Sequence, residues 1–377
     1  MIYCDNAATT KISDEVFNEM LPYLKDNFGN PSSLYSVGYK NKKAIEKARE
    51  QVAKAINAEP SEIFFTSGAT ESNNWVLNGI QSSNIITSDF EHASILNTCK
   101  KLEENHHFIN YIKPNSEGII SVDDIEKEIT CDTRLISIMA VNNEIGTIQP
   151  IKEIGEMCRE HRIYFHTDAT QAIGHIPIDV QKMNIDIMSF SGHKFHAPKG
   201  IGVLYIRNGV KIQPFMNGGH QESLMRAGTE NVASIVGIGK AIEIATHNLG
   251  KQNKLREMTN TFINRCYQEI GDIKLNGSYE NRIAGTVNLC VNNCYGEEIV
   301  LLLDTMGICV SAGSACNSGT TEPSRTLKAI GLTSEQALDS IRFSFDADIT
   351  ELEIKEVFDS FKKSVQMIDR INEVKNK

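Results

Sequence analysis

Residues 163–171 read Ile-Tyr-Phe-His-Thr-Asp-Ala-Thr-Gln, and residues 185–200 read Ile-Asp-Ile-Met-Ser-Phe-Ser-Gly-His-Lys-Phe-His-Ala-Pro-Lys-Gly. In each stretch a short apolar run ends in polar residues, which is typical of a buried strand that leads into a functional loop. An open parallel sheet brings the carboxyl ends of its strands to one edge, where ligands bind. We therefore expect Asp168, Gln171 and Lys194 to lie together at such an edge.

The same alternation extends over most of the chain. From residue 13 to residue 250, short apolar runs alternate with longer amphipathic stretches, which predicts a large α/β domain with a mostly parallel sheet between helices. We expect its strands at residues 63–66, 85–88, 135–141, 163–167, 185–189 and 202–206. Residues 251–377 mix strands expected at 286–291 and 341–345 with helices. We assign residues 1–12 and 251–377 to a smaller α+β domain.

Composition narrows the class of protein. The 377 residues carry a net charge of -10 and are 41% hydrophobic, which excludes a disordered or fibrous chain and disfavours sequence-independent binding of nucleic acid. The longest apolar runs fall far short of the ~20 residues of a membrane span, and the first residues do not resemble a secretory signal. We therefore expect a soluble, cytoplasmic protein. The nine cysteines include no Cys-x-x-Cys pair, so we expect neither a disulfide framework nor a metal site.

Residues 64–73, Phe-Phe-Thr-Ser-Gly-Ala-Thr-Glu-Ser-Asn, predict a phosphate site of another kind than the common glycine-rich nucleotide motifs, which the chain lacks. A strand here leads through small residues into the start of a helix. The backbone N–H groups of Gly68, Ala69 and Thr70, the Thr70 hydroxyl and the helix dipole can together hold a phosphate. Ser and Thr also cap helices that bind nothing, so this stretch alone leaves both interpretations open.

Lysine, carboxylate and phosphate cup are the parts that pyridoxal phosphate (PLP) requires. The lysine bonds to the aldehyde, the carboxylate pairs with the ring nitrogen, and the cup holds the phosphate. Taken singly, Lys194 reads as a surface lysine and Asp168 as a helix cap. Because all three parts follow one another along a single parallel sheet, we favour the cofactor.

Eight motifs over nearly the whole chain resemble those of the cysteine desulfurases of NifS/IscS type, which are PLP-dependent members of the class V aminotransferase family. The motifs are residues 5–10, 29–33, 66–72, 91–92, 141–146, 168–171, 191–194 and 226–231. The resemblance implies a fold-type I PLP-dependent transferase, L-cysteine as substrate and a homodimer.

The resemblance also implies a role for particular residues. Lys194 would carry the cofactor and later move protons at the substrate carbon, while Asp168 holds the ring nitrogen. Gln171 would bind the phenolic oxygen of the ring, and His92 would stack on the ring and act in acid–base steps. The remaining residues would bind phosphate or substrate: Ala69, Thr70, Ser191, His193 and, from a second subunit, Thr229 for the phosphate, and Asn143 and Arg342 for the substrate, with Asn143 also at the cofactor.

The segment 311–324 would carry the nucleophile, Cys316, in a loop rich in Gly and Ser. On this interpretation the enzyme converts L-cysteine to L-alanine and keeps the sulfur as a persulfide on Cys316. An acceptor protein, such as an iron–sulfur cluster scaffold or a component of tRNA thiolation, would then take the sulfur. Three alternatives stay open: a selenocysteine lyase, another PLP-dependent aminotransferase-like enzyme, and a non-catalytic sulfur carrier.

Overall fold

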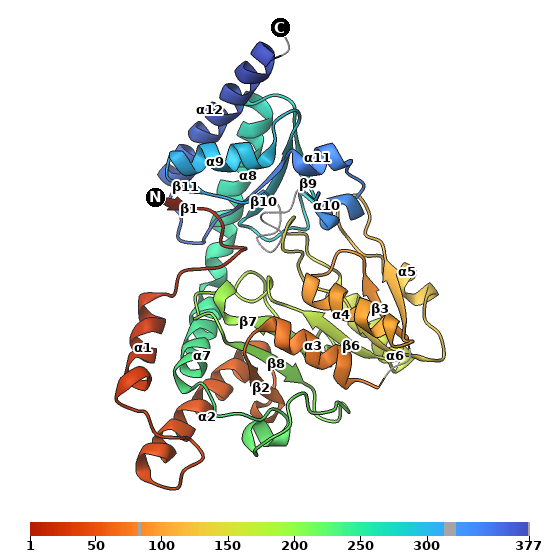
Figure 1. Cartoon of the computed structure of the whole chain (residues 1–377), viewed down its shortest axis with the longest axis vertical. Coiled ribbons are helices and arrows are strands. Elements are labelled where there is room, and N and C mark those ends of the chain that lie inside the picture. The colour runs from red at the N-terminus through yellow and green to blue at the C-terminus, as the bar shows by residue number, and fades with distance from the viewer. Residues whose placement is uncertain (82–83, 313–321, 376–377) are drawn as a thin grey trace.

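The computed structural model describes residues 1–81, 84–312 and 322–375, and its largest element is a seven-stranded sheet (Figure 1). The order across the sheet is β2-β8-β7-β6-β5-β3-β4. Strand β8 is antiparallel to both of its neighbours, and the other pairs are parallel. The strands are β2 (Ile63–Thr66), β3 (Asn84–Ser88), β4 (Phe108–Ile112), β5 (Thr133–Ser137), β6 (Tyr164–Asp168), β7 (Ile187–Ser191) and β8 (Gly202–Ile206).

The prediction of an α/β fold with a mostly parallel sheet is confirmed, and two strands, 63–66 and 202–206, have the predicted bounds. The strand predicted at 135–141 is wrong at its end, because β5 stops at Ser137. The neighbouring strand β3 ends at Ser88, so the residues that follow Ser137 have a partner strand on one side only. There the N–H groups of Ile138 and Ala140 still donate to β6 carbonyl oxygens.

Helices cover both faces of this sheet. Consecutive strand residues belong to different apolar clusters, as Leu135 and Ile136 do, because their side chains point to opposite faces. One face is covered by helices α3 (Ala69–Gly79) and α4 (Ala93–Glu104), and the fully buried Trp75 of α3 packs there. The other face is covered by α1 (Asp14–Lys25), α2 (Ser36–Ile56), α5 (Val122–Lys127), α6 (Ile151–His161) and α7 (Val232–His247). Two buried faces explain why the strands read as continuous apolar runs.

A third apolar cluster lies above the large sheet in Figure 1 and centres on a three-stranded antiparallel sheet of order β12-β10-β9. Phe262 packs there against four other phenylalanine rings. Strand β1 (Ile2–Tyr3) joins this cluster by pairing with β11 (Ile308–Cys309). The sheet and its helices are β9 (Ile273–Asn276), β10 (Thr286–Val291), β12 (Ser340–Ser344), α8 (Lys251–Glu269), α9 (Gly296–Thr305), α10 (Arg325–Ala329), α11 (Ser334–Leu338) and α12 (Glu351–Lys375).

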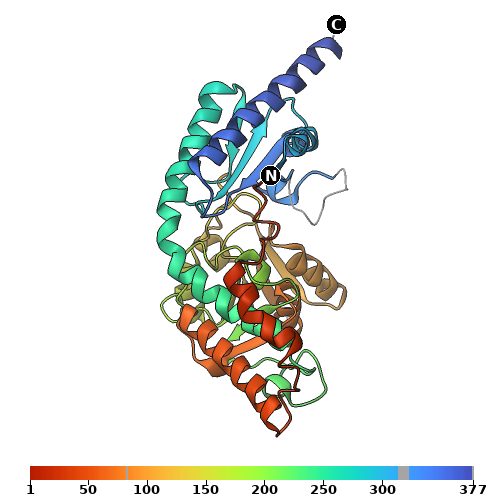
Figure 2. The same ribbon diagram turned by 90° about the vertical axis from the view of Figure 1, so that its left-hand side faces the viewer.

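Helices α7 and α8, separated only by a short turn at Asn248–Gly250, connect the helices of the large sheet with the three-stranded sheet along one side of the molecule (Figure 2). Ala7 accepts hydrogen bonds from Gln171 and Lys194, which follow β6 and β7, and Arg342 of β12 bonds to Asp5. None of the described helices combines the length and apolar character that a membrane crossing needs.

Candidate active site

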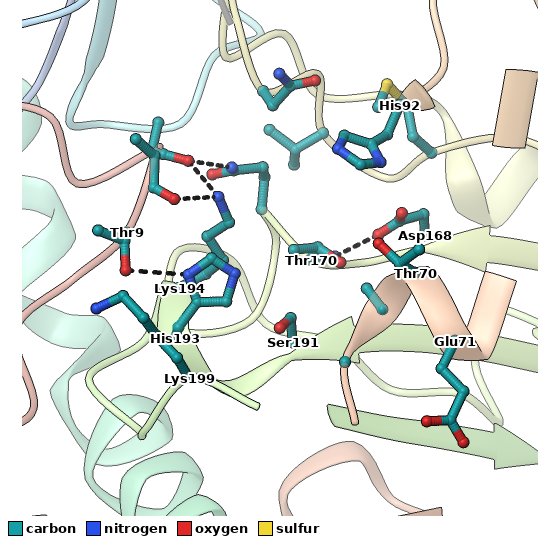
Figure 3. A pocket seen from close by; sticks show the side chains of 18 of the residues that line it. Thr9, Thr70, Glu71, His92, Asp168, Thr170, Ser191, His193, Lys194 and Lys199 are labelled. Atoms are coloured by element: carbon teal, nitrogen blue, oxygen red, sulfur yellow. Dashed lines mark hydrogen bonds between the residues drawn. The ribbon is translucent and has the colours of Figure 1, made fainter. Parts of the chain in front are cut away.

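A cavity of about 480 Å³ lies where these parts meet (Figure 3). Its walls come from the carboxyl ends of β6 and β7, the start of α3, the amino-terminal residues 7–9 and β12. Ten of the eleven described residues expected at the cofactor or substrate line it: Ala69, Thr70, His92, Asn143, Asp168, Gln171, Ser191, His193, Lys194 and Arg342. This volume falls in the range of small-molecule sites.

Lys194 ends a short 3-10 turn directly after β7. Its Nζ donates hydrogen bonds to the carbonyl oxygens of Ala7 at 2.6 Å and Ala8 at 2.7 Å. Gln171 steadies the same segment, because its Nε2 donates to the Ala7 oxygen at 2.9 Å. The amino terminus of the chain thus fixes the amine at the cavity wall, which no local sequence pattern indicated.

Asp168 ends β6 and is 5% exposed. Its Oδ1 accepts a hydrogen bond from the Thr170 N–H at 2.9 Å, and its Oδ2 accepts one from the Asn73 amide at 2.7 Å. His92 lies across the cavity as the N-cap of α4, where its Nδ1 accepts from the Ser94 N–H at 3.1 Å. A buried acceptor and an imidazole therefore form one side of the site, opposite Lys194 (Figure 3).

The phosphate cup forms where β2 leads into α3, because the first N–H groups of a helix have no partner within it. The start of β8 approaches the cup so closely that a Cβ on Gly202 would lie 2.6 Å from Gly68 Cα. His193 bonds to the Thr9 hydroxyl at 3.1 Å through Nδ1. Burial and the nearby charges of Lys194 and Lys199 lower the pKa of His193 to about 4, so it is neutral at pH 7.

Arg342 of β12 is 1% exposed. Its guanidinium donates to Asp5 Oδ1 at 2.6 Å and to the Asn143 carbonyl oxygen at 3.0 Å. Its buried Nε has no hydrogen-bond partner among the described residues. A guanidinium with an unused donor at a cavity wall is suited to a carboxylate ligand.

Two of the predicted residues stand apart. Thr229 does not line this cavity; it lies in a neighbouring depression that shares Ser67 and Gly200 with it. Cys316 lies outside the described residues, as does most of the segment 311–324.

Two ion pairs hold the loop 215–231, which contains Thr229, in place. Arg226 pairs with Glu71 at 2.8 Å in the first turn of α3, and Arg49 pairs with Glu222 at 2.8 Å. Glu222 also accepts the Phe65 N–H of β2 at 3.0 Å. Residues 222–224 all have positive φ angles, from 43° to 69°, so these contacts hold a strained backbone.

The sequence reasoning missed a buried polar network behind Asp168, made of Asn73, Ser94, Ser189, His166 and Ser137. Asn73 was part of the quoted stretch 64–73, and one signal was available. It stands in a helix beside the apolar pair Trp75 and Val76, where a buried amide must find partners.

The donor set fits PLP. The cup offers N–H and hydroxyl donors to an anion, Asp168 offers an acceptor to a protonated ring nitrogen, and Lys194 offers an amine to an aldehyde. Within the described ranges, no cluster of three His, Cys, Asp or Glu side chains could hold a metal ion.

Comparison with known proteins places the chain. The family model "Aminotransferase class-V" matches residues 2–357. The chain belongs to this family of PLP-dependent enzymes and, within it, to the cysteine desulfurases. It is 50% identical over 374 residues to the cysteine desulfurase IscS of Clostridium botulinum strain Hall, which covers 97% of this chain and 94% of the relative.

Solved structures agree. A NifS-like protein superposes with a TM-score of 0.91 at 35% identity, covering 97% of this chain and 99% of that chain. SspA, solved in complex with cysteine, superposes with a TM-score of 0.81 at 37% identity, covering 92% and 99%. These structures bear out the expected fold-type I architecture.

Proposed function

We propose that this enzyme uses PLP bound at Lys194 to remove sulfur from L-cysteine, and that Cys316 accepts the sulfur. The observation that carries the proposal is the meeting of Lys194, Asp168 and Arg342 around one cavity. The relatives named cysteine desulfurase and the complex of SspA with cysteine support the choice of substrate.

Each of these residues has a distinct task. Arg342 would bind the substrate carboxylate, and the Lys194 amine would move protons at the α carbon. Asp168 binds the protonated ring nitrogen. Bound PLP supplies the electron sink that stabilises negative charge at the α carbon. The residues of this chain would orient the substrate within the cavity.

In the sulfur step, the Cys316 thiolate attacks the substrate sulfur. An S–S bond forms, and the bond between carbon and sulfur breaks with its electron pair passing to the carbon fragment. That fragment takes up protons and leaves as L-alanine, while Cys316 keeps the sulfur as a persulfide. A transient acceptor protein, such as an iron–sulfur scaffold or a tRNA-thiolation component, then receives the sulfur in the cytoplasm.

The proposal includes a homodimer in which Thr229 reaches the phosphate of the partner's cofactor. Two observations support it. Thr229 lies outside its own cavity, and a depression of about 740 Å³ beside it is lined by Glu230, Tyr39 and Leu34. Leu34 is fully exposed and Phe28 is 83% exposed, which suits apolar contact with a second copy.

The test is to incubate the purified protein with L-cysteine, with and without a thiol reductant, and to measure alanine, sulfide and persulfide. We expect alanine and a Cys316 persulfide from the native chain. Cys316→Ala should still change the cofactor absorbance when cysteine is added, yet release neither product. Cys131→Ala, which removes an exposed thiol away from the cavity, should react like the native chain.

Other outcomes would contradict the proposal. If Cys316→Ala turns over as fast as the native chain, Cys316 is not the nucleophile, and a preference for selenocysteine would then indicate a lyase. If the PLP-loaded native chain is inert toward cysteine, a carrier or another aminotransferase-like enzyme is the better interpretation.

A further inference from the structure

Asn73 lies at the centre of the buried polar network behind the site. It is fully buried on α3, and its Nδ2 donates to Asp168 Oδ2 at 2.7 Å and to Ser94 Oγ at 2.9 Å. One amide thus contacts both the residue expected under the ring nitrogen and the residue beside His92. The geometry of this network determines where its protons lie.

On the side of His92, the hydrogen bonds determine which ring nitrogen carries the proton. The Ser94 backbone N–H donates to His92 Nδ1 at 3.1 Å, so this nitrogen is an acceptor and carries no proton in the neutral ring. The Ser94 hydroxyl, 2.8 Å from the same nitrogen, must therefore donate to it as well. It is free to do so because it accepts from Asn73. The proton of neutral His92 is consequently on Nε2.

On the side of His166, the donor and the acceptor of each hydrogen bond are determined as well. Because Nδ2 of Asn73 faces a carboxylate, its Oδ1 is the acceptor for the Ser189 hydroxyl. Ser189 has then used its proton, so His166 Nε2 donates to Ser189 Oγ at 3.1 Å. The Ser137 hydroxyl donates to His166 Nδ1 at 2.8 Å. Burial lowers the pKa of His166 to about 4, which agrees with a neutral ring that donates once and accepts once.

We propose that Asn73 is a positioning residue that fixes the Asp168 carboxylate and, through Ser94, holds His92 in the Nε2–H tautomer. Along the network that runs from Ser137 to His92, each group then donates to the next one in the direction of the cavity. His92 enters the reaction as a proton donor at Nε2 and cannot accept a proton there until it has given one up. The inference rests on the proposed function only in placing His92 beside the reacting atoms.

The tautomer can be observed directly by ¹⁵N NMR of the purified full chain labelled at histidine, with and without PLP. We expect at least about a tenfold excess of the Nε2–H form of His92, because the opposite tautomer loses two donors and sets N–H groups against each other. A majority of the Nδ1–H form would overturn the proposal, and this measurement needs no variant.

Variants test the role of Asn73. Asn73→Leu keeps the volume but removes the amide, and it should reduce the tautomer excess at least threefold because Ser94 loses the donor that orients its hydroxyl. Asn78→Leu on the exposed side of α3 is the matched control and should leave the ratio unchanged. Ser94→Ala retains the backbone donor and tests the same link if Asn73→Leu does not fold: the His92 Nδ1 resonance should shift.

An unchanged ratio in Asn73→Leu, or an unchanged Nδ1 resonance in Ser94→Ala, would show that Asn73 and Ser94 do not position His92. Loss of cysteine turnover with a native tautomer would instead count against the proposed function and leave this inference standing.

Discussion

Replacement of Arg49 by methionine tests how the loop 215–231 is held. The Arg49 guanidinium donates to both carboxylate oxygens of Glu222, at 2.8 and 2.9 Å, and the two side chains are only 12% and 4% exposed. An exposed ion pair contributes about 0–1 kcal/mol. Removal of one partner of a buried pair costs about 3–5 kcal/mol, because the other charge stays buried without compensation. Glu222 keeps its bond from the Phe65 N–H, so we expect the lower end, about 3 kcal/mol.

The assay is urea unfolding at pH 7 and a fixed chain concentration, because the proposed dimer would make stability depend on concentration. Arg49→Met should lower the free energy of unfolding by about 3 kcal/mol. Adding Glu222→Gln should restore most of the loss, since it removes the buried charge. The reasoning would be refuted if Arg49→Met lost less than about 1 kcal/mol, or if the double variant were no more stable than the single one.

Two further expectations concern pH and thiol reactivity. Burial opposes the charge of His196, but the hydrogen bond and charge of Asp346, 2.9 Å away, together with the Lys11 carbonyl oxygen and the charge of Asp348, outweigh burial and raise the pKa of His196. The pair therefore stabilises the fold fully below pH ~6.5 and ceases to stabilise it as the pH rises through the raised pKa of His196. His196→Phe should accordingly lower Tm at pH 6 but hardly at pH 9. Equal losses of Tm at the two pH values would contradict this expectation. Burial raises the pKa of Cys99 to about 12, whereas Cys131 is exposed. Iodoacetamide followed by mass spectrometry should therefore show Cys131 modified before Cys99 in the native chain; early modification of Cys99 would contradict this.

The sequence predicted the strands of the large sheet well where both faces are buried, because their apolar runs are then continuous. It missed β4 at residues 108–112, where four of the five residues are exposed or half-buried and Phe108 is 71% exposed. Such an edge strand has little pattern to read. The same reasoning explains the missed β1 and β11, which are two residues long.

The cavity residues could be predicted because they stand directly after recognisable strands or within motifs that resemble those of a known family. The contacts of Lys194 with Ala7 and Ala8 could not be predicted, because they join residues 187 and 186 positions apart. The network around Asn73 depends on where individual side chains point, and a sequence pattern does not specify that direction.

The carbonyl groups that hold Lys194 have a consequence for the timing of synthesis. Residues 7 and 8 are synthesised long before β12, yet the Ala7 N–H donates to the Ser344 hydroxyl at 2.9 Å, and Asp5 pairs with Arg342. These early residues therefore stay without their final neighbours until β12 has been translated. A growing chain can assemble the seven-stranded sheet around Lys194 and still lack one wall of the pocket. A chain cut short before β12 is made therefore lacks both Arg342 at the cavity wall and the Ser344 hydroxyl that accepts from Ala7.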